Sequence, residues 1–265
     1  MKVAARVFSV VLTGFQMVGA VAVGSDAIKE EKVTFEGVKY RVVRLSAERL
    51  KLVWKGKDGN PMRSFDQVQD YYQKQGERCV FLMNAGIYEP GGIPSGLHIQ
   101  DGKQLLPLNT KNGWGNFYLK PNGIFCIIKG WRGGAHVMST NDYSAYLKQR
   151  QRMHPYSAPV LAIQSGPLLV SGGKVHPKFR PNSDSKLYRN GVGVDDKGRI
   201  VFAITAKGQE VNLHGFARLF LHFGCKNALF LDGDISRMEL NPAEKLPSHA
   251  FGAIFTVTEP LSEDP

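Results

Sequence analysis

The chain has 265 residues, of which 43% are hydrophobic and 22% charged, and its 34 Lys+Arg against 23 Asp+Glu give a formal net charge of +11. This composition is that of a globular protein and excludes intrinsic disorder. The 29 Gly and 14 Pro follow no repeat and there is one long apolar run, which excludes collagen, coiled coils and multi-span membrane proteins. A chain of this length buries a sizeable core without a disulfide or metal scaffold.

The long apolar run lies at the start of the chain, from Val7 to about Val23, and follows Lys2 and Arg6. With the small residues of 20–22 as a cleavage site, it predicts a signal peptide over 1–22 and a periplasmic or secreted domain over 23–265. The alternative is an uncleaved membrane anchor. Cleavage would leave 32 basic and 23 acidic residues, a net charge of +9. Such a surface suits an anionic carbohydrate, or serves solubility alone; no nucleic-acid partner and no stable membrane insertion are expected.

The next part of the chain reads as strands and two helices. Residues 33–43 and 49–54 alternate apolar and polar side chains, as half-buried strands do. Ser64 and Gln67 form a capping box, which predicts a helix that ends near Gly76. The further predictions are a strand over 78–83, a hairpin over 97–106 around Asp101-Gly102, a hairpin over 116–128 around Pro121-Asn122-Gly123, and a polar helix over 140–153.

The last part of the chain predicts more hairpins and one further helix. Asn212 caps a helix whose apolar face includes Phe216 and Phe220, and Gly224 ends it. Strands are expected over 161–164, 168–170, 192–194, 199–205, 228–231 and 253–258, with a polar, basic loop over 177–190. Many hairpins with two or three helices indicate an α+β fold: a single domain with a large, mostly antiparallel twisted sheet.

The three cysteines carry no sign of catalysis. An exported chain with Cys79, Cys126 and Cys225 holds at most one intramolecular disulfide. Cys79 and Cys126 lie in apolar strand-like runs, so buried and unreactive thiols are expected.

Polar and glycine-rich segments interrupt the apolar strands at three places, and a fourth segment brings positive charge just before a strand. Ends of buried strands hold side chains rigidly while leaving them open to a substrate. If the four segments meet, carboxylates, amides and an arginine surround one cleft, which suits hydrolysis of an anionic glycoside. The segments are Asn84-Ala85-Gly86 with Glu89, Gln164-Ser165-Gly166-Pro167, Lys186 to Gly191, and Asp232 to Ser236.

Six motifs in order resemble those of the phosphodiester glycosidase family, and in particular a bacterial, exported subgroup of it. A lysosomal member of that family removes N-acetylglucosamine from a mannose phosphodiester. The resemblance spans about residues 80–257. Its motifs are Asn84-Ala-Gly-Ile-Tyr88, Ser95-Gly-Leu97, Gly115-Asn-Phe117, Gln164-Ser-Gly-Pro-Leu168, Arg189-Asn-Gly-Val-Gly193 and Leu231-Asp-Gly233.

The resemblance implies a hydrolase that cleaves the C1–O–phosphate bond of glycosyl phosphodiesters, as in envelope or extracellular polysaccharides. This reaction builds positive charge on the sugar ring and negative charge on the departing phosphate. Asp232 is the first candidate for the catalytic carboxylate and Glu89 the second. Arg189, whose planar fork suits phosphate, and Lys186 are the candidate phosphate ligands. The other candidate substrate-binding residues are Asn84, Gly86, Gln164, Ser165, Gly166, Asn190, Gly233, Asp234 and Ser236, although turn capping accounts equally well for Asn84, Gln164, Asn190 and Ser236.

Two departures from the family pattern leave a second interpretation open. The family commonly has two further glycines after Leu-Asp-Gly, where this chain has Asp234 and Ile235. A carboxylate and a branched side chain at these positions also fit a non-catalytic envelope protein that binds anionic glycans in the same cleft. No cofactor is expected; a calcium ion held by oxygen atoms near Asp232 is the one alternative, and no residue spacing demands it.

Overall fold

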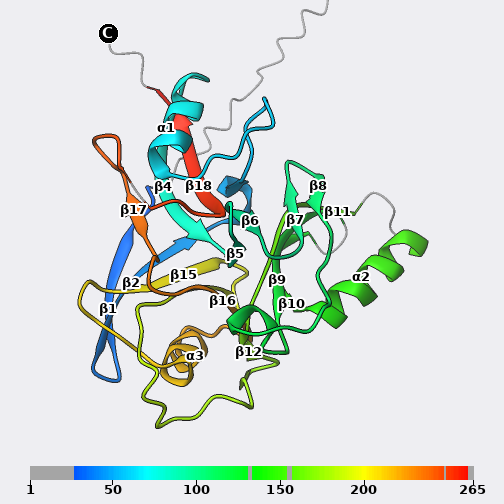
Figure 1. Ribbon diagram of the computed structural model, residues 1–265, viewed down its shortest axis with the longest axis vertical. Helices are drawn as coiled ribbons and strands as arrows, with labels where there is room; N and C mark the ends of the chain where they lie inside the picture. Colours follow the sequence, from blue (N-terminus) through cyan, green and yellow to red (C-terminus); the bar gives the residue numbers. More distant parts are fainter. Residues whose placement is uncertain (1–26, 131–132, 154–156, 248, 262–265) are drawn as a thin grey trace, which may run out of the picture.

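The computed structural model describes residues 27–130, 133–153, 157–247 and 249–261 (Figure 1). The predicted signal peptide over 1–22 lies outside the described residues. Within the described part of the chain, no helix has the length and apolar character needed to cross a membrane.

The largest sheet has seven strands, which are paired antiparallel. Its central strands β14 and β16 come from distant parts of the sequence and pair directly, with a register shift between Asn190 and Gly191. In spatial order its strands are β1 (Glu30–Phe35), β2 (Val38–Leu45), β15 (Ile200–Thr205), β14 (Asn190–Val194), β16 (Asn227–Asp232), β12 (Leu168–Ser171) and β13 (Lys174–Val175).

Two smaller antiparallel sheets and one two-stranded ribbon complete the strand structure of the described residues. The five-stranded sheet contains β10 (Gly134–Ser139), β9 (Gly123–Lys129), β11 (Ala158–Ser165), β7 (His98–Gln100) and β8 (Lys103–Leu106). The four-stranded sheet contains β17 (Met238–Leu240), β4 (Glu77–Ala85), β18 (Ala253–Pro260) and β3 (Lys51–Val53). The ribbon pairs β5 (Tyr88–Glu89) with β6 (Ile93–Pro94).

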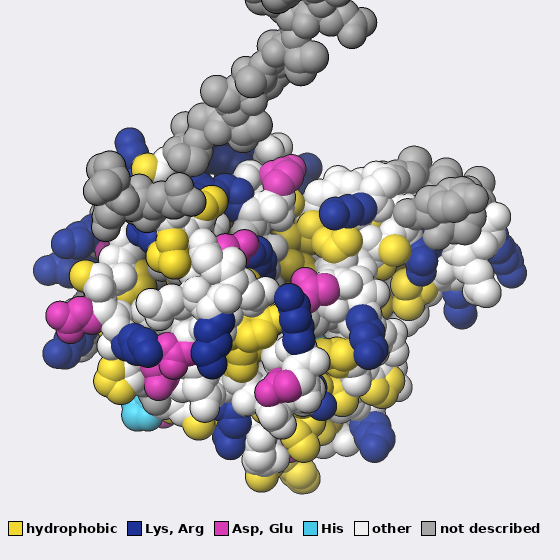
Figure 2. All heavy atoms as spheres, turned by 90° about the horizontal axis from the view of Figure 1, so that it is seen from above, with side chains coloured by type: hydrophobic (Ala, Val, Ile, Leu, Met, Phe, Trp, Pro, Cys, Tyr) yellow, Lys and Arg dark blue, Asp and Glu magenta, His cyan; other side chains and the backbone are white. Residues whose placement is uncertain are grey.

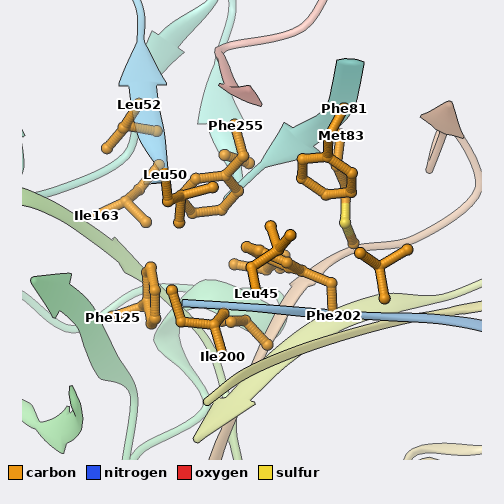
Figure 3. Close-up of a cluster of buried hydrophobic side chains, with 14 of the residues drawn as sticks. Leu45, Leu50, Leu52, Phe81, Met83, Phe125, Ile163, Ile200, Phe202 and Phe255 are labelled. Carbon is orange, nitrogen blue, oxygen red and sulfur yellow. The ribbon is translucent and has the colours of Figure 1, made fainter. Parts of the chain in front are cut away.

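The three sheets share one hydrophobic core, to which each contributes an inner face (Figure 3). Phe202 of β15, Phe125 of β9 and Phe255 of β18 meet there, with ring centroids 5.1 to 6.2 Å apart. Burial of such large aromatic rings supplies much of the hydrophobic free energy of folding. The three sheets are therefore parts of a single domain.

Each sheet carries one helix on its outer face, because its strands alternate apolar side chains between the two faces. Helix α1 (Phe65–Gln73) packs on β3, β4 and β18 of the four-stranded sheet. Helix α2 (Thr140–Met153) places Tyr143 and Tyr146 against the five-stranded sheet. Helix α3 (Leu213–His222) packs Phe216 and Phe220 on the seven-stranded sheet. The α+β fold, the three helices and the antiparallel pairing agree with the sequence-based prediction.

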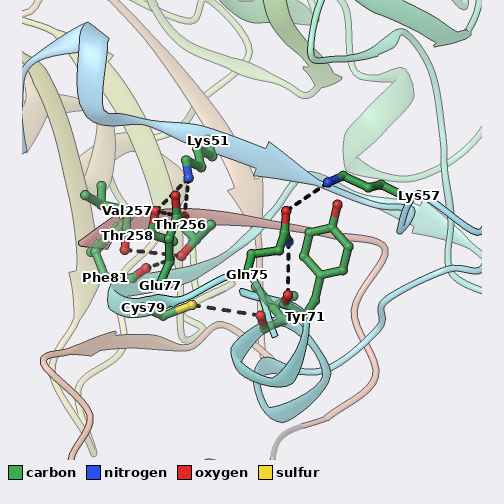
Figure 4. A network of polar contacts seen from close by, with 11 residues as sticks. Lys51, Lys57, Tyr71, Gln75, Glu77, Cys79, Phe81, Thr256, Val257 and Thr258 are labelled. Atoms are coloured by element: carbon green, nitrogen blue, oxygen red, sulfur yellow. Dashed lines mark hydrogen bonds and ion pairs between the residues drawn. The ribbon is translucent and has the colours of Figure 1, made fainter. Parts of the chain in front are cut away.

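A polar network links three strands of the four-stranded sheet on one side (Figure 4). The Lys51 ammonium of β3 donates to Glu77 of β4 and to Thr258 of β18, both at 2.6 Å. The Thr258 hydroxyl also donates to Glu77, at 2.5 Å. The bonds that the Glu77 carboxylate accepts lower its pKa, and the bond from Lys51 has the larger effect. The network joins β3, a short strand at the sheet edge, to its neighbours.

Three predicted elements need correction. The hairpin expected over 116–128 does not form: residues Asn116–Tyr118 are a 3-10 helix, η2, and β9 pairs with β10 and β11 instead. The run 33–43 is two strands, because Glu36 and Gly37 adopt φ of 49° and 80° and reverse the chain between β1 and β2. A second 3-10 helix, η1 (Ala47–Arg49), begins the region where a strand was expected over 49–54.

The cysteines are as expected: Cys79, Cys126 and Cys225 are buried and free. Burial raises their pKa values to about 11, 12 and 12 respectively.

Candidate active site

The ends of β4, β14 and β16 meet at Asn84, whose side chain joins all three strands. The Asn84 Nδ2 donates to Asp232 Oδ2 at 2.9 Å, and Asn190 Nδ2 donates to Asn84 Oδ1 at 3.0 Å and to its carbonyl oxygen at 3.1 Å. The backbone N–H of Arg237 also donates to Asn84 Oδ1, at 2.8 Å. Asn84 is only 1% exposed, so it holds these segments in one fixed arrangement.

Asp232 is the last residue of β16 and is partly exposed beside Asn84. Its Oδ1 accepts a hydrogen bond from the N–H of Gly233 at 2.7 Å, while Oδ2 accepts from Asn84. Burial, with a smaller contribution from the charge of Asp234, raises the pKa of Asp232 to about 6 against the lowering effect of these two bonds. A carboxyl group with such a pKa, ionised at neutral pH yet poorly solvated, is suited to acid–base or nucleophilic chemistry.

The turn after Asp232 accommodates the two residues that replace the family glycines. Gly233, Asp234 and Ile235 lie outside the left-handed region, so neither replacement meets backbone strain there. The Ile235 side chain packs into the cluster around α1, and Asp234 is exposed. Ser236 closes the turn by donating its N–H to the carbonyl of Gly233 at 2.9 Å.

Two buried polar atoms of this cluster have no hydrogen-bond partner among the described residues. They are Oδ1 of Asn190 and the hydroxyl of Ser236. An unpaired buried polar atom costs free energy, about 1–3 kcal/mol, unless a ligand or water satisfies it. Both atoms are therefore candidates to bind a substrate hydroxyl.

Ser165, the last residue of β11, bonds to two segments next to the candidate site. The Ser165 hydroxyl donates to the carbonyl of Leu231 at 3.2 Å and accepts from the N–H of Ile87 at 3.3 Å. Gly86 adopts φ of 63°, which favours glycine, and Gly166 is required by packing, since a Cβ there would stand 2.7 Å from Asn122 Cβ and 2.9 Å from the carbonyl oxygen of Phe117. The Gly166-Pro167 peptide bond is cis.

Gln164 and Glu89 have their hydrogen bonds elsewhere. The fully buried Gln164 accepts from the N–H groups of Leu97 and Asn109 and donates to the carbonyl of Asn109, so its side chain fixes the 95–109 segment. Glu89, on β5, is exposed and accepts from the hydroxyl of Ser95 at 2.8 Å. Among the described residues, no hydrogen bond joins either side chain to Asn84 or Asp232.

Lys186 and Arg189 occupy opposite environments. Lys186 is exposed on the loop before β14. Arg189 is 1% exposed and donates from Nε to the carbonyl of Val211 at 2.7 Å and from Nη2 to that of Ser185 at 3.0 Å. Burial lowers the pKa of Arg189 to about 10, and the negative charge of Asp234 opposes this.

Two residues of this region were absent from the sequence-based candidate set. Burial raises the pKa of Tyr88, and the charge of Asp232 adds to this; the Tyr88 hydroxyl donates to the carbonyl of Ala250 at 2.8 Å. Arg237 contributes only its backbone, because its guanidinium is engaged by Glu239 and the carbonyl of Pro247. Tyr88 ends the motif that begins at Asn84, so the sequence carried a signal for it; the backbone role of Arg237 has none.

No group of three or more His, Cys, Asp or Glu side chains that could hold a metal ion occurs among the described residues. The surface in Figure 2 carries Lys and Arg side chains spread over the face, with Asp and Glu among them.

Comparisons with known proteins agree with the resemblance. Residues 77–241 match the family described as Phosphodiester glycosidase. The uncharacterised protein YigE of Escherichia coli K12 is 30% identical over 220 residues, 83% of this chain and 79% of YigE. The catalytic domain of zebrafish N-acetylglucosamine-1-phosphodiester alpha-N-acetylglucosaminidase, auto-inhibited by its pro-peptide, aligns with a TM-score of 0.59 and 18% identity over 88% of this chain and 82% of that one. That likeness shows a shared fold.

Proposed function

Because this chain belongs to the phosphodiester glycosidase family, we propose that it hydrolyses the bond between C1 of a sugar and the phosphate oxygen of a glycosyl phosphodiester. The observation that supports this most is the carboxylate of Asp232. It lies where three strands end and is held by an amide and a backbone N–H, with a pKa raised to about 6.

The proposed reaction adds water across the C1–O bond. C1 gains the water oxygen, the C1–O bond breaks, and a phosphate monoester leaves with the electron pair. Positive charge builds on the ring, and the ionised Asp232 stabilises it, attacks C1 or activates the water. Because the phosphate monoester is a good leaving group, strong general-acid assistance is not needed. The unpaired Oδ1 of Asn190 accepts from a sugar hydroxyl, and the Ser236 hydroxyl binds a sugar hydroxyl or donates to a phosphate oxygen.

The test is turnover of a panel of α- and β-linked sugar phosphodiesters by the purified chain, with and without EDTA. Asp232→Asn keeps the shape of the side chain and removes its charge, so we expect hydrolysis to fall at least ~10³-fold. Asp101→Asn is the matched control, because Asp101 also precedes a glycine at a strand end but lies in the turn between β7 and β8. Equal rates for Asp232→Asn and wild type would refute the role of Asp232.

Glu89 is proposed as the second carboxylate. It lies on β5, and its carboxylate accepts a hydrogen bond from the hydroxyl of Ser95. If Glu89 acts in proton transfer, Glu89→Gln lowers kcat by ~10²-fold or more with little change in KM. A fully active Glu89→Gln variant would leave Asp232 as the catalytic carboxylate.

We also propose that the protein is exported and acts on envelope or extracellular polysaccharides. The apolar run after Lys2 and Arg6 and the net charge of +11 support this. Expression of the full chain followed by cell fractionation and N-terminal mass analysis tests it. The expected product is a periplasmic or secreted protein that begins near Val23; full-length protein in the cytoplasm would contradict export.

The alternative of a non-catalytic glycan-binding protein predicts a different result. Under that interpretation, glycan binding survives Asp232→Asn, no member of the panel is hydrolysed, and binding weakens with salt. The branched side chain of Ile235 does not argue against the enzyme, because it packs into the hydrophobic cluster around α1.

A further inference from the structure

A small cationic cavity lies at the N-terminus of α3, beside the loop that follows β13. Its volume is about 130 Å³. Basic side chains reach it from three directions: Lys178 and Arg180 from the loop, Arg189 from the start of β14, and His214 from the first turn of α3. The hydroxyl-bearing residues Ser183 and Ser185 complete its polar lining.

Arg189 forms the buried side of this cavity and has unused hydrogen-bonding capacity. Its Nε and Nη2 donate to the backbone carbonyls of Val211 and Ser185, but its buried Nη1 has no partner among the described residues. Within that part of the chain, Arg189 makes no ion pair with a carboxylate. A buried charge without a counter-charge is costly, so an arginine in this state indicates that an anion binds beside it.

The end of α3 adds to the positive potential. The side chain of Asn212 accepts from the N–H of Gly215 at 2.9 Å, so the helix begins at the wall of the cavity. The first turn of a helix carries a partial positive charge and free N–H groups, which favour oxyanions. Asp234 opposes this potential, since its charge acts on Arg189, and Asp184 lies on the same loop between two residues of the lining.

We propose that this cavity binds a phosphoryl group of the substrate, with Arg189 Nη1 at its base and Lys178 and Arg180 at its rim. The chain itself connects the cavity to the candidate active site: Arg189 lines the cavity, and the next residue, Asn190, bonds to Asn84, which in turn bonds to Asp232. That the phosphoryl group belongs to the substrate rests on the proposed function. The binding of a phosphate ion to the cavity does not.

The test uses inorganic phosphate as the probe and the purified chain as the target. A ligand that binds only the folded state stabilises it by an amount that saturates with concentration. Calorimetric titration and thermal unfolding, at constant ionic strength set with chloride, should therefore show saturable binding of phosphate to the wild type. Phosphate should also inhibit hydrolysis competitively, raising KM and leaving kcat unchanged.

Two double variants that lose the same charge distinguish phosphate binding in the cavity from general attraction of phosphate to a basic protein. Lys178→Ala with Arg180→Ala removes the rim of the cavity, and we expect about tenfold weaker phosphate binding. Lys174→Ala with Lys226→Ala removes two exposed charges that do not line the cavity, and affinity should stay within about twofold. Equal affinities of the two double variants, or no saturable binding to the wild type, would overturn the proposal.

Arg189 is tested separately because its replacement disturbs a buried site. Arg189→Lys keeps a positive charge and shortens the donor, so phosphate binding should weaken while circular dichroism confirms the fold. If Arg189→Lys does not fold, the rim variants decide the proposal alone. Asp232→Asn should still bind phosphate, which keeps the two proposals distinguishable: loss of hydrolysis with retained binding supports both. Hydrolysis by a wild type that binds no phosphate refutes only the cavity.

Discussion

Asp232 combines two features that set the pH dependence of the proposed activity. Its carboxyl group is poorly solvated, and its two oxygens each accept one hydrogen bond. If the ionised form is required, kcat/KM falls on the acid side with an apparent pKa of about 6, the value for Asp232 in the substrate-free folded protein. A pH–rate profile of the wild type measures this. An activity that stays constant down to pH 4 would contradict an ionised Asp232.

The raised pKa of Asp232 also makes the free energy of unfolding depend on pH. An aspartate in an unfolded chain has a pKa of ~3.9, so between pH 4 and 6 the folded protein binds more protons at Asp232 than the unfolded chain does. The contribution of Asp232 to the free energy of unfolding therefore falls as pH rises through this window. We expect the free energy of unfolding of Asp232→Asn, relative to that of the wild type, to increase by roughly 2–3 kcal/mol between pH 4 and pH 7. Urea unfolding of both proteins at the two pH values measures the change.

Asp234 is expected to tune this carboxylate. Its negative charge contributes to the raised pKa of Asp232. Asp234→Asn should therefore move the acid side of the pH–rate profile to lower pH, because the ionised form of Asp232 is then favoured. Asp101→Asn, far along the chain in the turn between β7 and β8, provides the comparison. Coincident profiles for all three proteins would show that Asp234 does not act on the catalytic group.

Asn84 is expected to serve both stability and chemistry. Asn84→Ala removes its bonds to Asp232, Asn190 and Arg237 and leaves buried groups unpaired, at a cost of about 3 kcal/mol or more. Loss of the bond that it donates to Asp232 should also raise the pKa of that carboxyl group further. Urea unfolding and the pH–rate profile measure the two effects independently. An unchanged stability would refute the structural role.

At this scale, the sequence predicted the residues whose signal is local. Asn84 and Asp232 lie at the ends of apolar strands and Asn190 at the start of one, and the structure brings the three into contact. Gln164 has the same local signal, but its partners Leu97 and Asn109 come from a loop that only tertiary folding brings near. The orientation of Arg189 likewise depends on Val211, which lies 22 residues further along the chain.

Helices α1 and α3 begin with different capping arrangements, which gives a paired prediction. Asn212 accepts from Gly215 and also donates to the carbonyls of Pro181 and Ser183. The capping box predicted for Ser64 and Gln67 is wrong, because the Ser64 side chain makes no capping bond. Asn212→Ala should therefore cost about 2 kcal/mol of unfolding free energy, and Ser64→Ala less than ~0.5. Thermal or urea unfolding of both variants measures the difference. Equal costs would contradict the assignment of the caps.

The elements predicted correctly are those with their own local chemistry. Asp101-Gly102 fixes the hairpin of β7 and β8, and helical periodicity fixes α3. The hairpin over 116–128 was wrong because a turn motif does not specify which strand pairs with β9. Its partner β10 lies beyond it in the chain and has only short apolar stretches around His136 and Ser139.

At the scale of the whole molecule, the domain consists of three helix-and-sheet layers around one core. The sequence predicted the strand content and the fold class, since both follow from periodicity. It could not predict the division into three sheets, because β14 pairs with β16 and β4 pairs with β18 across large separations in sequence. Such pairings depend on packing of the whole domain.

The buried cysteines make this layered arrangement measurable. Cys79 packs in the layer of α1, Cys126 in that of α2 and Cys225 in that of α3. A thiol reagent modifies each one only after its layer opens, because the reactive thiolate is both buried and disfavoured. Since the layers share a core, all three thiols should become reactive at one common rate in mild denaturant. A thiol that reacts ahead of the others would identify a layer that separates while the rest of the domain stays folded.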